Sequence, residues 1–171
     1  MNHRRILSKS LNHLSHAYLK STLKLLGLML AKSSIKNPRI QQELLDFREG
    51  AKILFKVNYL KGGYFILQLR NQTLHLIKEP EQAITEYDLA IMIKHPQHAF
   101  RILTLQESNT LAVANNRFAT SGDASLAIRF INCLEIVEAN LLPKFISKNM
   151  LAKHEDIVLV ERIKFIKNLM I

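Results

Sequence analysis

The chain has 171 residues, of which 48% are hydrophobic and 22% are charged, so it has the size of one domain with room for a modest extension. This apolar content excludes a disordered chain, and the scarcity of glycine (5) and proline (4) argues against low-complexity linkers and glycine-rich phosphate loops. Because Cys133 is the single cysteine, a disulfide framework and a cysteine-rich zinc site are excluded, and a reducing, cytoplasmic compartment is expected.

The net charge of +10 is concentrated at the two ends of the chain. Residues 1–40 carry eight Lys/Arg and no acid, residues 41–143 carry ten against eleven Asp/Glu, and residues 144–171 carry six against three. A basic end attracts a polyanion, such as an anionic lipid surface, a nucleic acid or an acidic partner.

The N-terminal segment is expected to form an amphipathic helix rather than a cleaved signal or a membrane span. Its longest apolar run, residues 23–31, is interrupted by Lys24 and is far shorter than the ~20 residues that cross a bilayer. Helical spacing predicts an apolar face made of Leu7, Leu11, Leu14, Tyr18, Leu25 and Met29. The basic residues that lie largely away from its centre are Arg5, Lys9, Lys20 and Lys24. This pattern predicts either an interfacial helix with basic membrane contacts or a helix docked on its own domain.

A second helix is predicted from Pro38 to about Arg48, because Asn37 can cap it, Pro38 suits a first helical turn and Gly50 can end it. After this helix, the period of the apolar residues changes from 3.6 to 2, which indicates half-buried strands.

Four strands are predicted between Ile53 and Ile93, as a meander. Turns are expected at 61–63 and 71–72, and a polar connector at 79–82 precedes the fourth strand.

The rest of the chain is predicted to be mostly helical. Short helices are expected after His95 and from Ser108, followed by a fifth strand over 118–122 and a long helix that Asp123 caps. The apolar stripe of the long helix is Leu126, Phe130, Leu134, Val137 and Leu141. A last amphipathic helix is expected from about Glu155. The order of elements predicts an α+β fold, with a roughly five-stranded, mainly antiparallel sheet covered by helices.

Histidine and glutamate residues that could act in catalysis or bind a metal are present, but their spacing forms no catalytic pattern. The histidine pairs with i, i+3 spacing are His13/His16 and His95/His98. Neither pair has a cysteine nearby or the H-E-x-x-H arrangement, so no metal site is predicted. Glu135 and Glu138 lie one helical turn apart and are expected on the solvated side of their helix. We therefore expect neither catalytic activity nor a cofactor.

The apolar residues of the sheet and of the following segments are the candidate lining of a binding site. A sheet under a few helices either fills its interior or keeps a slot for an apolar ligand, and periodicity does not distinguish the two. The candidate lipid-binding residues are Phe55, Val57, Leu67, Leu69, Leu89, Ile91, Phe100, Leu103, Leu111, Phe118, Phe130 and Leu134.

Residues 37–146 resemble the sterol-carrier-protein type 2 family of lipid-binding domains. The resemblance rests on the predicted strands over 53–93, the short helices after His95 and, above all, the stretch Phe118-Ala-Thr-Ser-Gly-Asp-Ala-Ser-Leu-Ala-Ile. More narrowly, the helix region resembles that of the bacterial stand-alone members that assist ubiquinone biosynthesis. The residues that carry this resemblance are Gly122-Asp123, Leu126, Asn132, Glu138 and Pro143-Lys144. The chain departs from the family at Asn115-Asn116-Arg117, where a glycine is common.

The resemblance implies a non-enzymatic lipid-binding accessory protein with an apolar cavity between sheet and helices. An isoprenoid quinone precursor, or another lipid, would be its ligand, and the chain would be cytoplasmic and peripherally associated with an anionic membrane. The expected divisions are a basic amphipathic helix (1–36), the lipid-binding domain (37–146) and a C-terminal amphipathic helix (147–171). Two alternatives stay open: a basic protein that binds nucleic acid or a protein partner, and an accessory subunit of an enzyme with Glu135/Glu138 or His95/His98 in its site.

Overall fold

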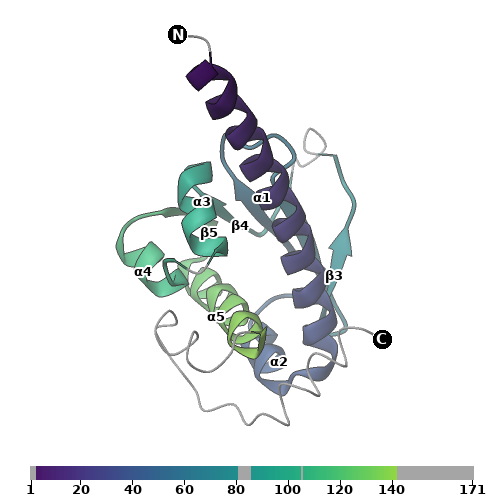
Figure 1. Cartoon of the computed structure of the whole chain (residues 1–171). Helices are drawn as coiled ribbons and strands as arrows, with labels where there is room; N and C mark the ends of the chain where they lie inside the picture. Colours follow the sequence, from purple (N-terminus) through teal and green to yellow (C-terminus); the bar gives the residue numbers. More distant parts are fainter. Residues whose placement is uncertain (1–2, 81–85, 105, 142–171) are drawn as a thin grey trace.

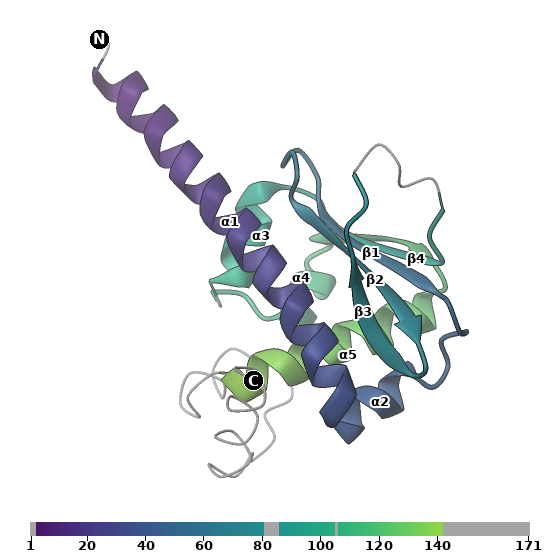
Figure 2. The ribbon, with the colours of Figure 1, turned by 90° about the vertical axis from the view of Figure 1, so that its right-hand side faces the viewer.

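The computed structural model describes residues 3–80, 86–104 and 106–141, with side chains from residue 15 to residue 139. A five-stranded sheet forms one layer, and the helices lie against one of its faces (Figure 1 and Figure 2). This arrangement confirms the predicted α+β fold class. The predicted C-terminal helix lies outside the described residues.

The sheet has the strand order β3-β2-β1-β4-β5, and its central pair, β1 and β4, is parallel. The strands are β1 (Lys52–Val57), β2 (Tyr64–Arg70), β3 (Thr73–Ile77), β4 (Leu89–Ile93) and β5 (Phe118–Gly122). Strands β1, β2 and β3 form the expected meander. The prediction that the fourth strand continues this meander is wrong, because β4 pairs with β1 instead of β3. Alternation along a strand specifies which side chains share a face but not which strand lies beside it.

The helices begin close to the predicted residues because their capping side chains are in place. They are α1 (His3–Lys36), α2 (Pro38–Leu44), α3 (Pro96–Leu103), α4 (Asn109–Ala114) and α5 (Ala124–Leu141). Asn37 accepts a hydrogen bond from the Arg39 amide at the start of α2, and Ser108 accepts one from the Leu111 amide at the start of α4. Helix α2 ends at Leu44, earlier than the predicted Arg48.

Glu79, which follows β3, contacts residues on the sheet face that bears no helix. The Tyr64 hydroxyl donates to the Glu79 carbonyl (2.8 Å), and Lys52 Nζ pairs with the Glu79 carboxylate (3.1 Å). The Lys52 amide donates to Asp88 Oδ2 (2.8 Å) where the chain enters β4. A small apolar cluster is buried on this face, formed by Leu54, Ile66 and Ala90.

Helix α1 packs on the sheet through a face that only partly coincides with the predicted apolar face. Its buried apolar residues are Leu19, Leu23, Leu26, Met29 and Leu30. Of the predicted apolar face, Met29 is buried, whereas Tyr18 and Leu25 are exposed by 44% and 56%, as the interfacial alternative would leave them. The side chains of Leu7, Leu11 and Leu14 lie outside the described residues. Because residues 18–35 are apolar on two sides of the helix, periodicity alone does not distinguish the docked side from the exposed side.

The apolar core does not stop at the boundary expected near residue 36. Leu23 of α1, Phe55 of β1 and Phe130 of α5 belong to one continuous cluster. The second half of α1 therefore shares a core with residues 37–141. Among the described helices, none is both long and apolar enough to cross a membrane.

Candidate lipid-binding site

The inner face of the sheet, which faces the helices, is built from aromatic and branched side chains. Phe55 lies at its centre, stacked on Phe65 of β2 (ring centroids 5.1 Å apart, planes 8° apart) and in edge contact with Phe118 of β5 (6.5 Å). The register explains this grouping, because Phe55 pairs with Phe65 on one side and with Ile91 on the other. Aromatic pairs in these geometries stabilise a layer beyond the area that they bury.

The structure brings most of the predicted lipid-binding residues into this layer. Nine belong to the core cluster: Phe55, Val57, Leu67, Leu69, Leu89, Ile91, Phe118, Phe130 and Leu134. Leu103 is partly buried and packs against the cluster. Phe100 and Leu111 are instead exposed, by 37% and 51%. The layer is apolar throughout, and a ligand slot within it stays a prediction.

Two residues that sequence reasoning missed hold α1 against the inner face. A Cβ atom on Gly27 would lie 3.0 Å from Phe65 Cγ and 3.1 Å from Leu76 Cδ1, so the missing side chain permits the close approach of helix and sheet. Ser34 Oγ accepts a hydrogen bond from the Leu74 amide of β3 (2.8 Å) and donates to the Ala31 carbonyl (2.8 Å). The sequence signal that could have identified Gly27 as a contact with the sheet was a small residue within a predicted helix.

Helix α5 is tied to α2 by polar side chains. Asn132 Nδ2 donates to Glu43 Oε1 (3.2 Å), and Arg129 pairs with both Glu43 (3.5 Å) and Asp46. The buried thiol of Cys133 lies in the adjacent core, where desolvation raises its pKa to about 12. It is a packing residue rather than a nucleophile at neutral pH.

The other side of α5 holds α4 through two carboxyl groups. Asn109 Nδ2 donates to Glu138 Oε2 (2.9 Å), and the Thr110 hydroxyl donates to Glu135 Oε1 (2.6 Å). The expected solvated position of this pair is wrong, because Glu135 is buried and Glu138 is half-buried. Desolvation, together with the nearby Glu135, raises the pKa of Glu138 to about 8. The carboxyl group of Glu138 is therefore mainly protonated at neutral pH.

A second polar cluster lies beside α3. Arg117 pairs with the buried Glu107 (3.2 Å), and its guanidinium also lies 3.2 Å from His98 Nε2. The hydrogen bond from Asn115 is the main cause that lowers the pKa of Glu107, and burial is the main cause that lowers the pKa of His98. The His98 and His95 rings meet edge to face (5.3 Å). Within the described chain, no group of three His, Cys, Asp or Glu side chains is placed to hold a metal ion.

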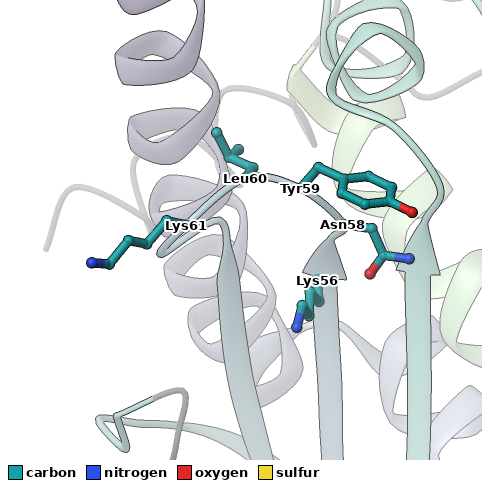
Figure 3. A pocket seen from close by; sticks show the side chains of 5 residues that line it. All are labelled: Lys56, Asn58, Tyr59, Leu60 and Lys61. Carbon is teal, nitrogen blue, oxygen red and sulfur yellow. The ribbon is translucent and has the colours of Figure 1, made fainter.

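A hollow of about 580 Å³ lies at the loop that follows β1 (Figure 3). Its lining is Lys56, Asn58, Tyr59, Leu60 and Lys61. Tyr59 has a left-handed backbone (φ 62°), and its ring stacks on His95 (5.4 Å). Lys61 points away from Tyr59, so these side chains do not converge on one point. None of the twelve predicted lipid-binding residues lines this hollow.

Apolar side chains of the helical layer reach the surface where α1 meets α3. Tyr18 and Phe100 are exposed by 44% and 37%, and their rings are in edge contact (6.0 Å). Leu103, one turn after Phe100, packs against the core. We call Tyr18, Phe100 and Leu103 the α1–α3 junction.

No protein-family model matches the chain, and no curated protein matches it. Among solved structures, the chain is similar to a UbiJ-SCP2 ubiquinone synthesis protein (14% identity, TM-score 0.44, covering 81% of this chain and 96% of that one). It is also similar to the sterol carrier protein domain 2 of Helicoverpa armigera (10%, 0.48, 70% and 90%). A third is the sterol carrier protein 2 like 2 of Aedes aegypti (14%, 0.33, 56% and 89%). Each of the three names contains sterol carrier protein or SCP2.

Proposed function

We propose that this chain is a lipid-binding accessory protein without catalytic activity of its own. It holds an apolar ligand between the inner face of the sheet and helices α1, α3 and α5. The observation that carries this proposal is the α1–α3 junction, where the exposed rings of Tyr18 and Phe100 are in contact one helical turn before Leu103, which packs against the core. The proposed entrance for the lipid chain lies there.

The chemistry of the interior suits retention rather than reaction. Each methylene that leaves water contributes ~0.8 kcal/mol, so an apolar slot retains a long chain without any specific polar contact. The side chains that could act as acids or bases have structural partners instead. Glu135 and Glu138 bind the residues that begin α4, and His98 contacts Arg117. These contacts support binding as the function.

The finer assignment is an isoprenoid quinone precursor, handled in ubiquinone biosynthesis. It rests on the sequence resemblance of Gly122-Asp123, Leu126 and Asn132 to the bacterial stand-alone accessory factors. Such a precursor is too apolar to reach soluble enzymes unaided, and a carrier that hides its chain solves that problem.

Exchange of such a ligand requires contact with a membrane, for which the basic residues of α1 are the proposed site. Arg5, Lys9, Lys20 and Lys24 supply the charge, and each contributes roughly 1 kcal/mol near an anionic surface. Lys24 is exposed and Lys20 is half-buried, while the side chains of Arg5 and Lys9 lie outside the described residues. The resulting attachment is peripheral and weakens with salt.

The decisive experiment is mass spectrometry of organic extracts from the full chain purified without detergent. Wild-type protein is expected to carry a long-chain lipid, and Phe100→Asp is expected to reduce its amount about tenfold, because a carboxylate in an apolar entrance must lose water. Tyr87→Asp is the matched control, because Tyr87 is similarly exposed (41%) but lies outside the α1–α3 junction. An empty wild-type protein, or equal lipid in the two variants, contradicts the proposal.

Nucleic-acid binding is the alternative function, and the charge of α1 favours it. The helix contains seven Lys/Arg and no acid between His3 and Lys36. Binding of this kind predicts affinity for DNA or RNA that falls steeply with salt, in the absence of binding to lipid vesicles.

A further inference from the structure

The loop between β1 and β2 holds one aromatic ring outside the core. Tyr59 is exposed by 81%, the largest exposed fraction among the large hydrophobic residues of the described chain. The next residue, Leu60, is exposed by only 3% and belongs to the core cluster. Figure 3 shows the two side chains on different sides of the loop. The ring of Tyr59 therefore cannot turn inward unless Leu60 leaves the core.

Hydrogen bonds fix this loop in a conformation that is unfavourable for tyrosine. The Val57 amide donates to the Gly63 carbonyl (2.7 Å), and the Gly63 amide donates to the Leu60 carbonyl (2.8 Å). Tyr59 has a φ of 62°, a region that glycine and asparagine occupy more readily than a bulky residue. Strained positions of this kind cluster at functional sites, so the exposed ring is a candidate contact for a partner.

The end of the sheet that carries this loop is basic. Three segments meet there, since β1 and β4 end at the place where β2 and β5 begin, and together they contain four Lys/Arg and no Asp or Glu: 56–65, 92–98 and 115–118. Lys61 is exposed, and Lys94 donates to the neutral side chain of Asn116 (2.7 Å). Arg117 differs from these two, because it pairs with the buried Glu107. The positive charge of Lys61 and Lys94 favours an anionic partner.

The exposed ring also lies close to the α1–α3 junction. Tyr59 stacks on His95 (5.4 Å), the residue that precedes α3. Phe100 of the junction follows His95 by five residues, a distance of about 7.5 Å along a helix. Figure 2 shows the loop between β1 and β2 at the end of the molecule toward which the N-terminal part of α1 extends. A surface that contacts Tyr59 therefore lies next to the proposed lipid entrance.

The surface of a bilayer suits these groups better than a small soluble anion does. The side chains of the hollow point in different directions, so they do not surround a small ligand. A tyrosine ring combines an apolar body with a polar tip, and such rings are enriched at the boundary between lipid headgroups and acyl chains. Lysines beside the ring are attracted to the phosphate groups of anionic lipids.

We propose that Tyr59, Lys61 and Lys94 form a contact site for an anionic membrane, called the β1–β2 loop site below. The ring of Tyr59 enters the interface, and the two lysines bind lipid phosphates. This inference rests on the proposed function, because a protein that exchanges lipid must bring its entrance to a bilayer. It adds a contact on the sheet to the one proposed for α1. Two separate contacts determine the orientation of the protein and turn the α1–α3 junction toward the membrane.

The test uses the full chain with a fluorescent reporter. Because the sequence has no tryptophan, Tyr59→Trp introduces a single reporter at the β1–β2 loop site. With phosphatidylcholine–phosphatidylglycerol vesicles, its emission is expected to shift to shorter wavelength and to be quenched by brominated acyl chains. Tyr87→Trp is the matched control, because Tyr87 is also exposed (41%) but precedes β4 at the opposite end of the sheet. Its emission is expected to stay unchanged.

Two further variants separate the contribution of charge from that of the ring. Lys61→Gln is expected to weaken vesicle binding about fivefold at low salt. Arg70→Gln removes an exposed charge at the other end of β2 and is expected to bind as the wild type does. Tyr59→Asn is expected to weaken binding at high salt as well, yet to keep or raise the melting temperature, because asparagine tolerates the left-handed backbone. All of these variants are expected to keep the wild-type lipid content.

Several results would overturn the proposal. One is a wild type that does not bind the vesicles, or that binds them while the Tyr59→Trp emission stays unchanged. Another is equal weakening by Lys61→Gln and Arg70→Gln. A response of the reporter to inorganic phosphate alone would indicate a site for a free anion, and a response to RNA without vesicles would indicate a nucleic-acid site. If the wild type still carries lipid in any of these cases, only the β1–β2 loop site fails. An empty protein whose Tyr59→Trp reporter enters the vesicles contradicts the proposed function instead.

Discussion

Helices α1 and α5 cover the same face of the sheet, but their positions are set by different forces. Polar side chains on two sides of α5 bind its neighbours, with Arg129 paired to α2 and Glu138 bound to α4. Helix α1 is held mainly by apolar packing, and Ser34 supplies its hydrogen bond to β3. Neighbouring helices therefore enclose α5, whereas one side of α1 stays open. The enclosed helix completes the core, and the open helix contributes to the core on one side and leaves Leu25 and Leu28 exposed on the other.

The largest effect that tests this comparison concerns two leucines of α1 that are two residues apart. Leu23 is fully buried, and Leu25 is 56% exposed. Leu23→Ala is expected to lower the free energy of unfolding by about 3 kcal/mol, because it removes core contacts and leaves a cavity. Leu25→Ala is expected to change it by less than ~0.5 kcal/mol. Urea unfolding of both variants measures the difference, and equal effects would show that α1 is not divided into a core side and an open side.

The next effect tests the close contact between α1 and the sheet. Gly27→Val is expected to destabilise the protein by about 1–3 kcal/mol, because its side chain would meet Phe65 and Leu76 in a space that is already filled. Lys24→Val, at an exposed position of the same helix, controls for the lower helix propensity of valine. A wild-type melting temperature for Gly27→Val would mean that α1 can move away from the sheet at little cost.

The start of α5 is a place where sequence alone was sufficient. The predicted strand 118–122 is β5 as observed, and Asp123 caps α5 by accepting a hydrogen bond from the Ser125 amide (2.6 Å). Gly122 has a φ of 109°, a conformation that a side chain rarely adopts. Local chemistry determines this boundary, so a local pattern predicts it. Of the predicted apolar stripe of α5, Phe130, Leu134 and Val137 are buried and Leu126 packs against the core, while the side chain of Leu141 lies outside the described residues.

The elements that sequence did not predict depend on distant contacts. Periodicity placed Tyr18 and Leu25 on one apolar face of α1 but did not determine whether that face is buried, since both sides of the helix satisfy a helical repeat. The position of β4 beside β1 follows from how the chain crosses the sheet, which no local pattern records. Burial of Glu135 depends on α4, which lies 25 residues away in the chain at Thr110. In each case the missing information was the identity of the neighbour.

A smaller effect distinguishes two adjacent serines at the end of α1. Ser34→Ala is expected to cost about 1–2 kcal/mol, because the buried Leu74 amide loses the hydroxyl that accepts its hydrogen bond. Ser33 is also buried, but its hydroxyl has no hydrogen-bond partner within the described chain. Ser33→Ala is therefore expected to be neutral or to raise the melting temperature. The reverse order of the two variants would contradict the proposed anchoring of α1 to β3.

The last effect concerns α5 and depends on pH, and over the interval from pH 7 to pH 9 it is the smallest. Burial raises the pKa of Glu138 to about 8, from an ordinary value of 4.5. Between these values the folded state binds more protons than the unfolded state, so this group lowers stability as pH rises, and its penalty is complete above pH 8. From pH 7 to pH 9, the loss is on the order of 1 kcal/mol.

Glu138→Gln isolates this contribution, since glutamine keeps an oxygen for Asn109 but does not ionise. The variant is expected to match the wild type near pH 4.5 and to exceed its melting temperature at pH 9. Taking the difference between variant and wild type removes the opposing effect of His98, whose lowered pKa favours folding as the pH rises through about 6.5. If the melting temperatures of Glu138→Gln and the wild type differ by the same amount from pH 4.5 to pH 9, Glu138 is solvated. In that case α5 would be as open on this side as α1 is at Leu25 and Leu28, and the contrast between the two helices would rest on α2 alone.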